Sequence, residues 1–136
     1  MTDEFKKYQR WLKKADDSLK RELETIKNYP EEIKKRFYRD LSFGTGGIRG
    51  ILGAGSAMMN VHVIRRAAQG LANYGRKIRK DRSVVVCYDT RKMSREFAIE
   101  SAKVLKANGF KVHVFDQPRP TPMLSFAVRE LHADWG

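Results

Sequence analysis

Residues 83–116 read SVVVCYDTRKMSREFAIESAKVLKANGFKVHVFD, and this stretch decides the fold class. The β-branched run at 83–89 predicts a strand that is buried on both faces. Residues 110–116 predict a second strand with clearer alternation between apolar and polar positions. Because a helical pattern separates the two strands, we expect a right-handed βαβ unit with parallel strands.

The rest of the chain is rich in helical patterns. Apolar residues that recur every three or four positions, together with capping residues, define five segments. We expect helices over residues 3–27, 30–40, 61–80, 95–107 and 122–132. Asn60, Ser94 and Thr121 are suitable N-caps, and Asn108-Gly109 is a suitable helix end. A further strand would normally follow the last helix, so we expect the sheet to be one strand short.

The composition indicates a folded chain with an unusual charge. Of its 136 residues, 41% are hydrophobic and 32% are charged, and the net charge is +12. Residues 41–136 hold 16 basic and 7 acidic side chains, so most of the excess lies outside the first 40 residues. This charge is compatible with a polyanionic partner, a phosphorylated substrate or an unbalanced fragment.

The sequence offers no sign of a membrane or of an oxidising compartment. No run approaches the ~20 apolar residues that span a bilayer, and the first residues do not resemble a signal peptide. The single cysteine, Cys87, lies in an apolar strand pattern and is expected to be a buried structural thiol. We therefore expect a cytoplasmic protein.

A glycine-dense segment, residues 43–56, holds six of the ten glycines. It does not fit the dinucleotide fingerprint, because Arg49 stands where glycine is required, and it lacks the Lys-Ser/Thr of a P-loop. Exposed backbone N–H groups, the Thr45 hydroxyl and the Arg49 guanidinium on one turn would suit a phosphate monoester. A plain tight turn is the structural alternative.

Two further loops follow the predicted strands. Tyr88-Asp89-Thr90-Arg91 comes after the first strand, and a proline-rich loop with Arg119 and Thr121 comes after the second. The carboxyl ends of parallel strands share one edge of a sheet, where such folds bind ligands, so we expect a basic rim that faces phosphate. The alternative for the first loop is an Asp–Arg pair that only orders it.

Other polar residues favour ordinary structural roles. The three histidines lack the spacing of metal ligands, and we expect no metal site in this chain. The basic run at 76–82 ends a predicted helix, where cations complement the helix dipole. A solvated helix end is therefore favoured over a nucleic-acid patch, for which stacking aromatic residues are missing.

Five motifs in register give the chain a family resemblance. They are residues 43–50, Met59-Asn60, 69–72, 88–91 and 120–122. Together they resemble the first domain of the α-D-phosphohexomutase family, which includes phosphoglucomutases and phosphomannomutases. The resemblance implies a three-layer α/β/α sandwich with a mixed, mostly parallel sheet over residues 41–136. Residues 1–40 look like the N-terminal helical extension of the phosphoglucomutases and phosphopentomutases of this family.

The resemblance also implies an activity of the isomerase class. It is the reversible transfer of a phosphoryl group between the C1 and C6 oxygens of a hexose, through a phosphoserine and a bisphosphorylated sugar, with Mg²⁺. Arg49 matches the arginine that contacts the phosphate, and Thr45 and Gly46 would shape its loop. Arg91 and Thr121 would buttress the serine from neighbouring turns.

The chain departs from the family pattern at its end. The serine loop, Thr-Ala-Ser-His-Asn-Pro, should begin just after Gly136, and the metal, sugar-selecting and distal phosphate loops belong to later domains. We therefore expect a truncated domain that contains neither the catalytic serine nor metal ligands and is inactive alone. Glucose, mannose and pentose substrates stay open.

Sugar phosphate and the missing domains are the expected partners. Two classes other than an enzyme fragment also stay open. One is a small basic protein that binds nucleic acid, which the charge suggests and the missing reading helix disfavours. The other is an assembly module that self-associates through its unfinished sheet edge.

Overall fold

The computed structural model describes residues 1–78 and 82–136, which form two compact units, Met1–Val63 and Ile64–Gly136. Residues 79 and 80 fall within the predicted helix over 61–80, and residues 79–81 fall within the basic run at 76–82. Those parts of the two predictions lie outside the described residues.

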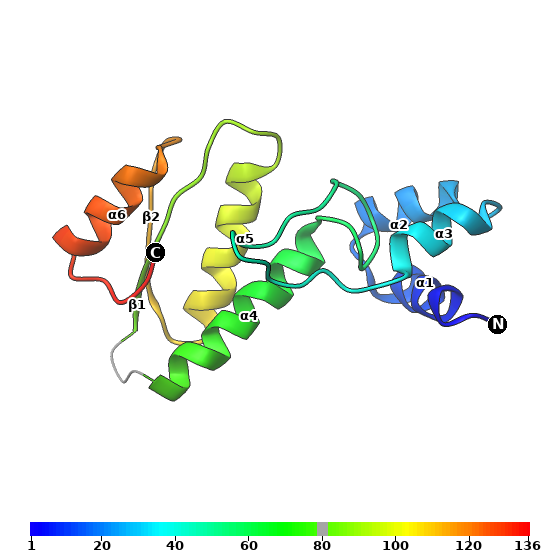
Figure 1. Cartoon of the computed structure of the whole chain (residues 1–136), viewed down its shortest axis with the longest axis horizontal. Helices are drawn as coiled ribbons and strands as arrows, with labels where there is room; N and C mark the ends of the chain where they lie inside the picture. Colours follow the sequence, from blue (N-terminus) through cyan, green and yellow to red (C-terminus); the bar gives the residue numbers. More distant parts are fainter. Residues whose placement is uncertain (79–81) are drawn as a thin grey trace. The chain divides into compact units, whose positions relative to one another are not determined.

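The first unit begins with three short helices, α1 (Asp3–Lys14), α2 (Asp17–Thr25) and α3 (Pro30–Phe37) (Figure 1). The predicted single helix over 3–27 is therefore wrong. The chain is extended at Ala15 and Asp16, where ψ is 160° and 152°. The apolar period continues across this break because both helices bury their stripes in the same core, so periodicity alone does not reveal it.

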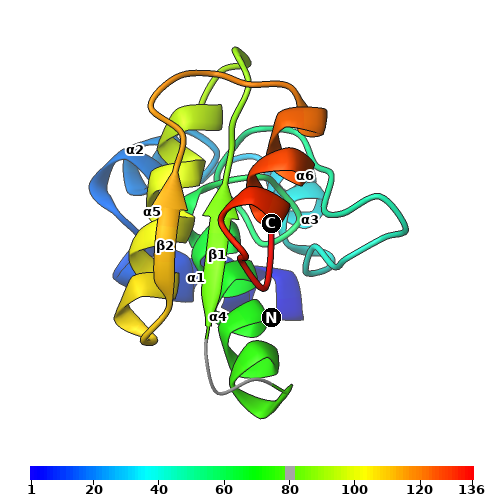
Figure 2. The same cartoon turned by 90° about the vertical axis from the view of Figure 1, so that its left-hand side faces the viewer.

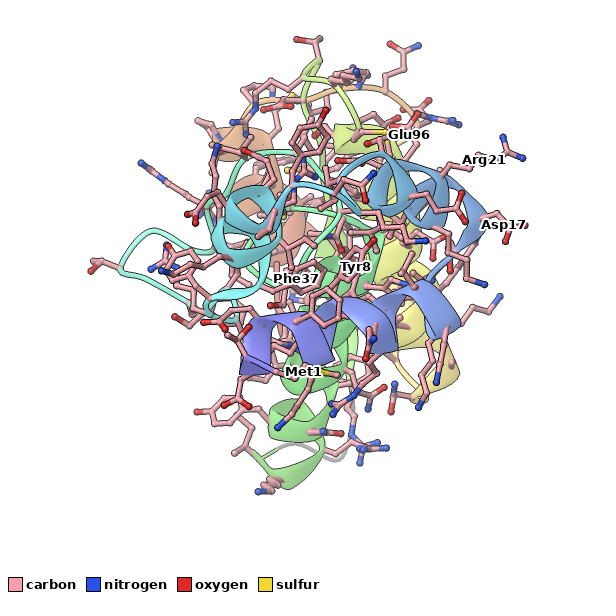
Figure 3. The ribbon with its side chains drawn as sticks, turned by 90° about the vertical axis from the view of Figure 1, so that its right-hand side faces the viewer. Met1, Tyr8, Asp17, Arg21, Phe37 and Glu96 are labelled. Atoms are coloured by element: carbon pink, nitrogen blue, oxygen red, sulfur yellow. The ribbon has the colours of Figure 1, made fainter. Side chains whose placement is uncertain are left out.

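That core is built around two aromatic side chains (Figure 3). Tyr8 of α1 and Phe37 of α3 are both buried and meet edge to face, with ring centroids 6.0 Å apart. The Tyr8 hydroxyl donates a hydrogen bond of 3.0 Å to the carbonyl of Leu23, which lies in α2. One side chain thus links all three helices through packing and a satisfied buried hydroxyl. The other members of this cluster are Ile26, Ile33 and Ala54.

The second unit contains the predicted βαβ arrangement (Figure 2). Strand β1 (Ser83–Val86) pairs in parallel with β2 (Lys111–Val114), and α5 (Ser94–Ala107) connects them. Both strands are shorter than predicted. One further hydrogen bond, from the Phe115 N–H to the Val86 carbonyl, joins the two segments at the ends of the strands. Both segments then continue as loops.

Helices lie on both sides of this strand pair (Figure 1). On one side are α5 and the part of α4 (Val61–Ile78) that belongs to this unit, and on the other is α6 (Thr121–Glu130). Neighbouring side chains of a strand point to opposite faces, and Val84 and Val85 are both 3% exposed. The prediction that this strand is buried on both faces is confirmed.

The chain returns to the sheet after α6. The Val85 N–H donates to the Trp135 carbonyl at 3.0 Å, and the Trp135 N–H donates to the Ser83 carbonyl at 3.1 Å. These bonds form a parallel bridge between Val84 and Trp135. Residue 135 therefore lies beside β1 through an isolated bridge, while the sheet of the described residues has two strands.

Two predicted helix caps are wrong. Ser94 is the first residue of α5, and its hydroxyl accepts the Asp89 N–H at 3.1 Å, while Met93 stands at the cap with φ of 67°. Thr121 is likewise the first residue of α6, after Pro120. A hydroxyl beside a helical pattern predicts a cap, whereas the Ser94 hydroxyl binds the backbone N–H of Asp89 in the preceding loop. The predicted helix end at Gly109 is confirmed, because its φ of +85° suits glycine.

We predict that Phe37→Ala lowers the free energy of unfolding by about 3–5 kcal/mol, because it leaves a cavity among three helices. Phe37 is 0% exposed, whereas Phe43 is 68% exposed. The matched control Phe43→Ala should change the free energy by less than about 0.5 kcal/mol. Urea denaturation followed by circular dichroism measures both, and equal effects would contradict this assignment of the core.

Candidate functional site

A tight turn forms the tip of the glycine-dense segment in the first unit. The Gly44 N–H donates to the Gly47 carbonyl at 2.8 Å, and the Gly47 N–H donates back to the Gly44 carbonyl at 3.4 Å. Gly47 has φ of +102°, which side chains other than glycine rarely adopt. Thr45 and Gly46 are left exposed at the tip.

Arg49 folds back toward this turn. Its Nη2 atom lies 3.7 Å from the position that a Cβ would take on Gly46, and the residue is exposed. Within residues 1–78 and 82–136, no carboxylate is found paired with Arg49. The structure therefore brings together three of the predicted residues, Thr45, Gly46 and Arg49, with the cation available to a ligand.

Close packing holds the segment that follows Arg49. A Cβ on Gly50 would lie 2.7 Å from Cδ1 of the buried Leu41, so a side chain at this position would require Leu41 to move. The Met59 N–H donates to the Ile51 carbonyl at 2.8 Å, and the Gly53 N–H donates to the Met59 carbonyl at 3.0 Å. Residues 51–59 therefore form a loop that is tied at both ends.

Asn60 closes this loop from the inside. Its Nδ2 donates to the carbonyls of Gly53 and Gly55, both at 2.9 Å, and to that of Met58 at 3.3 Å. Its Oδ1 accepts the Val63 N–H at 3.1 Å, which confirms the predicted N-cap of α4. Asn60 is 3% exposed, and no sequence pattern predicts its three bonds to the loop.

The other two predicted site residues, Arg91 and Thr121, belong to the second unit. Asp89 Oδ1 accepts the Arg91 backbone N–H at 3.0 Å, and its Oδ2 accepts the Arg91 Nε–H at 2.7 Å. The pair thus orders its own turn, as the structural alternative supposed, while the Arg91 side chain stays 86% exposed. Hydrogen bonds from the Arg91 backbone, then from Ser94 and the guanidinium, hold the pKa of Asp89 below its usual range.

A depression of about 710 Å³ lies at the carboxyl ends of β1 and β2. It is lined by residues 88–93, Arg95, Glu96, Asp116 and Pro118. The proline-rich loop joins this edge through the Arg119 N–H, which donates to the Tyr88 carbonyl at 3.0 Å. The Arg119 side chain turns to the Pro118 carbonyl and Asp116 of its own loop. Thr121 is exposed at the start of α6 and does not line the depression.

Comparison with known proteins adds to this geometry. Residues 40–136 match the family described as phosphoglucomutase/phosphomannomutase, alpha/beta/alpha domain I. The chain belongs to this family. The match includes the Arg49 turn, the Asp89–Arg91 turn and the proline-rich loop.

Curated phosphoglucomutases match most of the chain. That of Staphylococcus saprophyticus is 40% identical over 126 residues, and that of Staphylococcus haemolyticus is 39% identical over 126 residues. Each alignment covers 93% of this chain and 23% of the relative. The chain therefore spans about a quarter of the length of the curated relatives it matches. No solved structure matches the chain.

The remaining reactive side chains of this phosphoglucomutase/phosphomannomutase family member have modest roles. Cys87 is half-buried, and burial, followed by the nearby Asp89 charge, raises the pKa of its thiol. A raised pKa keeps the thiol protonated and unreactive. Over residues 1–78 and 82–136, no three His, Cys, Asp or Glu side chains are grouped to hold a metal ion. In the same part of the chain, no helix is long and apolar enough to cross a membrane.

We predict that Asn60→Asp destabilises the chain by about 2–4 kcal/mol, because it keeps the helix cap but places a carboxylate against three carbonyls. Asn73→Asp is the matched control, because the Asn73 Oδ1 only accepts hydrogen bonds, from Gln69 and Arg76. That change should stay within about 0.5 kcal/mol. Thermal and urea unfolding measure both variants, and a neutral Asn60→Asp would show that the three bonds contribute little.

We predict that the Asp89 carboxyl titrates below the usual range of aspartate in a pH series of carbon NMR spectra. Because folding lowers its pKa, its stabilising effect is complete above the unfolded-state pKa and is lost as pH falls through the folded-state value. Arg91→Gln should raise the Asp89 midpoint only part of the way, since the backbone N–H of residue 91 still donates. A midpoint that Arg91→Gln leaves unmoved would argue against the guanidinium contact.

Proposed function

We propose that residues 41–136 are domain I of a phosphoglucomutase, with residues 1–40 as its helical extension. The whole protein would interconvert glucose 1-phosphate and glucose 6-phosphate through a phosphoserine and glucose 1,6-bisphosphate. The observation that carries this proposal is the exposed Arg49 guanidinium beside Thr45 and Gly46, on a turn inside the family match. Phosphomannomutase and phosphopentomutase are the alternatives within the family, and no observation favours a nucleic-acid or assembly function.

The chemistry of this turn suits a phosphoryl group. Phosphoryl transfer needs positioning and neutralisation of the phosphoryl oxygens more than covalent help from the protein. A guanidinium offers a planar fork of donors, and Arg49 has no paired carboxylate within the described residues to compete for it. The Thr45 hydroxyl and the backbone N–H groups at Gly46 add neutral donors on the same turn.

In this proposal Arg91 and Thr121 support the serine loop. The Asp89 carboxylate fixes the Arg91 turn, so the long side chain leaves from an ordered backbone. The finer fold assignment, a three-layer α/β/α sandwich, is supported by α6 on one side of the strands and α4 and α5 on the other. The parallel bridge at Trp135 supports a mostly parallel sheet.

The remaining requirements would be met outside this chain. We infer that Mg²⁺, which would stabilise phosphoryl charge, is held by groups beyond residues 1–136. The partners of this chain would be a sugar phosphate and the later domains of the same protein, in the cytoplasm.

An NMR titration of the ¹⁵N-labelled 136-residue chain with glucose 1-phosphate tests the proposal. We expect saturable shifts at Thr45, Gly46 and the Arg49 side chain, and no effect from glucose at equal concentration. Arg49→Ala should weaken binding at least about tenfold, the cost of one charged hydrogen-bonding group. Arg39→Ala is the matched control, because Arg39 is exposed and its guanidinium stacks on Tyr38.

A coupled assay for glucose 6-phosphate adds a second test, in which the chain alone should show no turnover. Shifts confined to other basic residues, with Thr45 and Gly46 unmoved, would overturn the proposed site. Clear turnover would show that a nucleophile lies within these 136 residues.

A further inference from the structure

An ion pair of the helical extension holds both backbone polar groups of one loop residue. Glu22 lies in α2, Arg36 lies in α3, and Ala54 lies in the loop of residues 51–59. We infer that Glu22 and Arg36 are positioning residues that fix this loop and, through it, the turn with Arg49. The inference rests on the proposed function, because it makes the extension a determinant of phosphate affinity.

The contacts are reciprocal and local to the first unit. Glu22 Oε1 accepts the Ala54 N–H at 3.1 Å, and Arg36 Nη1 donates to the Ala54 carbonyl at 3.2 Å. The same two side-chain atoms bind each other at 2.5 Å. The Glu22 carboxylate thus binds the backbone donor of Ala54, and the Arg36 guanidinium binds its backbone acceptor. The arrangement therefore requires the acidic residue in α2 and the basic residue in α3.

The loop backbone is pressed against α3 at the same place. A Cβ on Gly55, where φ is +138°, would lie 2.6 Å from the Arg36 carbonyl oxygen. That carbonyl also accepts the Ala57 N–H at 2.9 Å. The Ser56 hydroxyl donates to the Arg39 carbonyl at 2.7 Å. The loop therefore caps the end of α3 and cannot shift without losing these bonds.

A short path leads from Ala54 to the phosphate-facing turn. Gly53, next to Ala54, donates to the Met59 carbonyl, and the Met59 N–H donates to the Ile51 carbonyl. Ile51 is two residues from Arg49, and the Gly50 backbone between them lies against Leu41. Every link in this path involves the loop backbone, and Asn60 holds the carbonyls of Gly53 and Gly55 on either side of Ala54. Releasing Ala54 would therefore loosen the segment that carries Arg49.

Burial of the Arg36 side chain and of Ala54 distinguishes this pair from an ordinary surface ion pair. The Arg36 side chain is 16% exposed and Ala54 is 0% exposed, whereas the Glu22 side chain is 38% exposed, so water competes little for the Arg36 bonds and more for the Glu22 carboxylate. Glu32 also accepts from Arg36, at the Nε atom and 3.3 Å, but has no bond to the loop. Arg36 therefore has one partner that reaches the loop and one that does not, which supplies a matched control.

The test uses three variants of the full 136-residue chain. Arg36→Met removes the cationic half of the clamp and leaves Glu22 alone with the Ala54 N–H, Glu32→Gln removes only the charge of the outer partner, and the double variant Glu22→Arg with Arg36→Glu reverses the pair. The reversed pair can still join α2 to α3, but it faces a donor toward the Ala54 N–H and an acceptor toward the Ala54 carbonyl. Amide hydrogen exchange at Ala54 and NMR titration with glucose 1-phosphate are measured for each.

We expect Arg36→Met to speed exchange at Ala54 and to weaken glucose 1-phosphate binding, each at least about fivefold, with Glu32→Gln within about twofold of the original chain. The reversed pair should recover thermal stability relative to Arg36→Met but not the slow exchange or the affinity. Recovery of all three properties would show that the pair only stabilises the helices and would overturn the inference.

The same data separate this inference from the proposed function. If the original chain does not bind glucose 1-phosphate at Thr45 and Gly46, the proposed function fails, whatever the exchange rates are. If it binds there and Arg36→Met binds equally well, the proposed function stands and the positioning role fails. If Arg36→Met does not fold, the test can still be made. The exchange rate at Ala54 and the affinity for glucose 1-phosphate are then compared between the reversed pair and Glu32→Gln.

Discussion

The arrangement of the first unit depends on the close approach of a glycine-dense backbone to the end of α3. Gly55 lies where a Cβ would meet the Arg36 carbonyl oxygen, and Gly50 lies where a Cβ would meet Leu41. This contact lets side chains from the helices satisfy loop amides that would otherwise be buried without partners. The exposed tip with Thr45 and Arg49 can then remain open to a ligand, because its base is held.

Much of the fold followed from the sequence because one signal dominated each segment. The apolar run around Val84 and Val85 predicted a strand buried on both faces, and Asn108-Gly109 predicted a helix end. Both predictions are confirmed. The break at Ala15 and Asp16 could not be seen, because tertiary packing lets two helices share one apolar period. The strands were overestimated, because apolar residues continue after the last paired residue of each strand.

The candidate site was only partly predictable. Thr45, Gly46 and Arg49 are near neighbours in sequence, so their common turn followed from glycine content. The bonds from Asn60, Glu22 and Arg36 to the loop run to backbone atoms across up to 32 residues. Backbone N–H and carbonyl groups are the same in nearly every residue type, so no pattern of side chains in the sequence predicts such contacts. That Arg91 and Thr121 support a serine loop stays a prediction.

The clamp on Ala54 has a consequence for how this family diverges. The bonds are made to main-chain atoms of residue 54. This residue therefore needs only a small side chain, and its identity does not reveal the contact. Selection would instead act jointly on positions 22 and 36, whose substitutions must keep an acceptor in α2 and a donor in α3. Among relatives, this geometry would therefore produce correlated substitutions at positions 22 and 36, without a matching change at position 54.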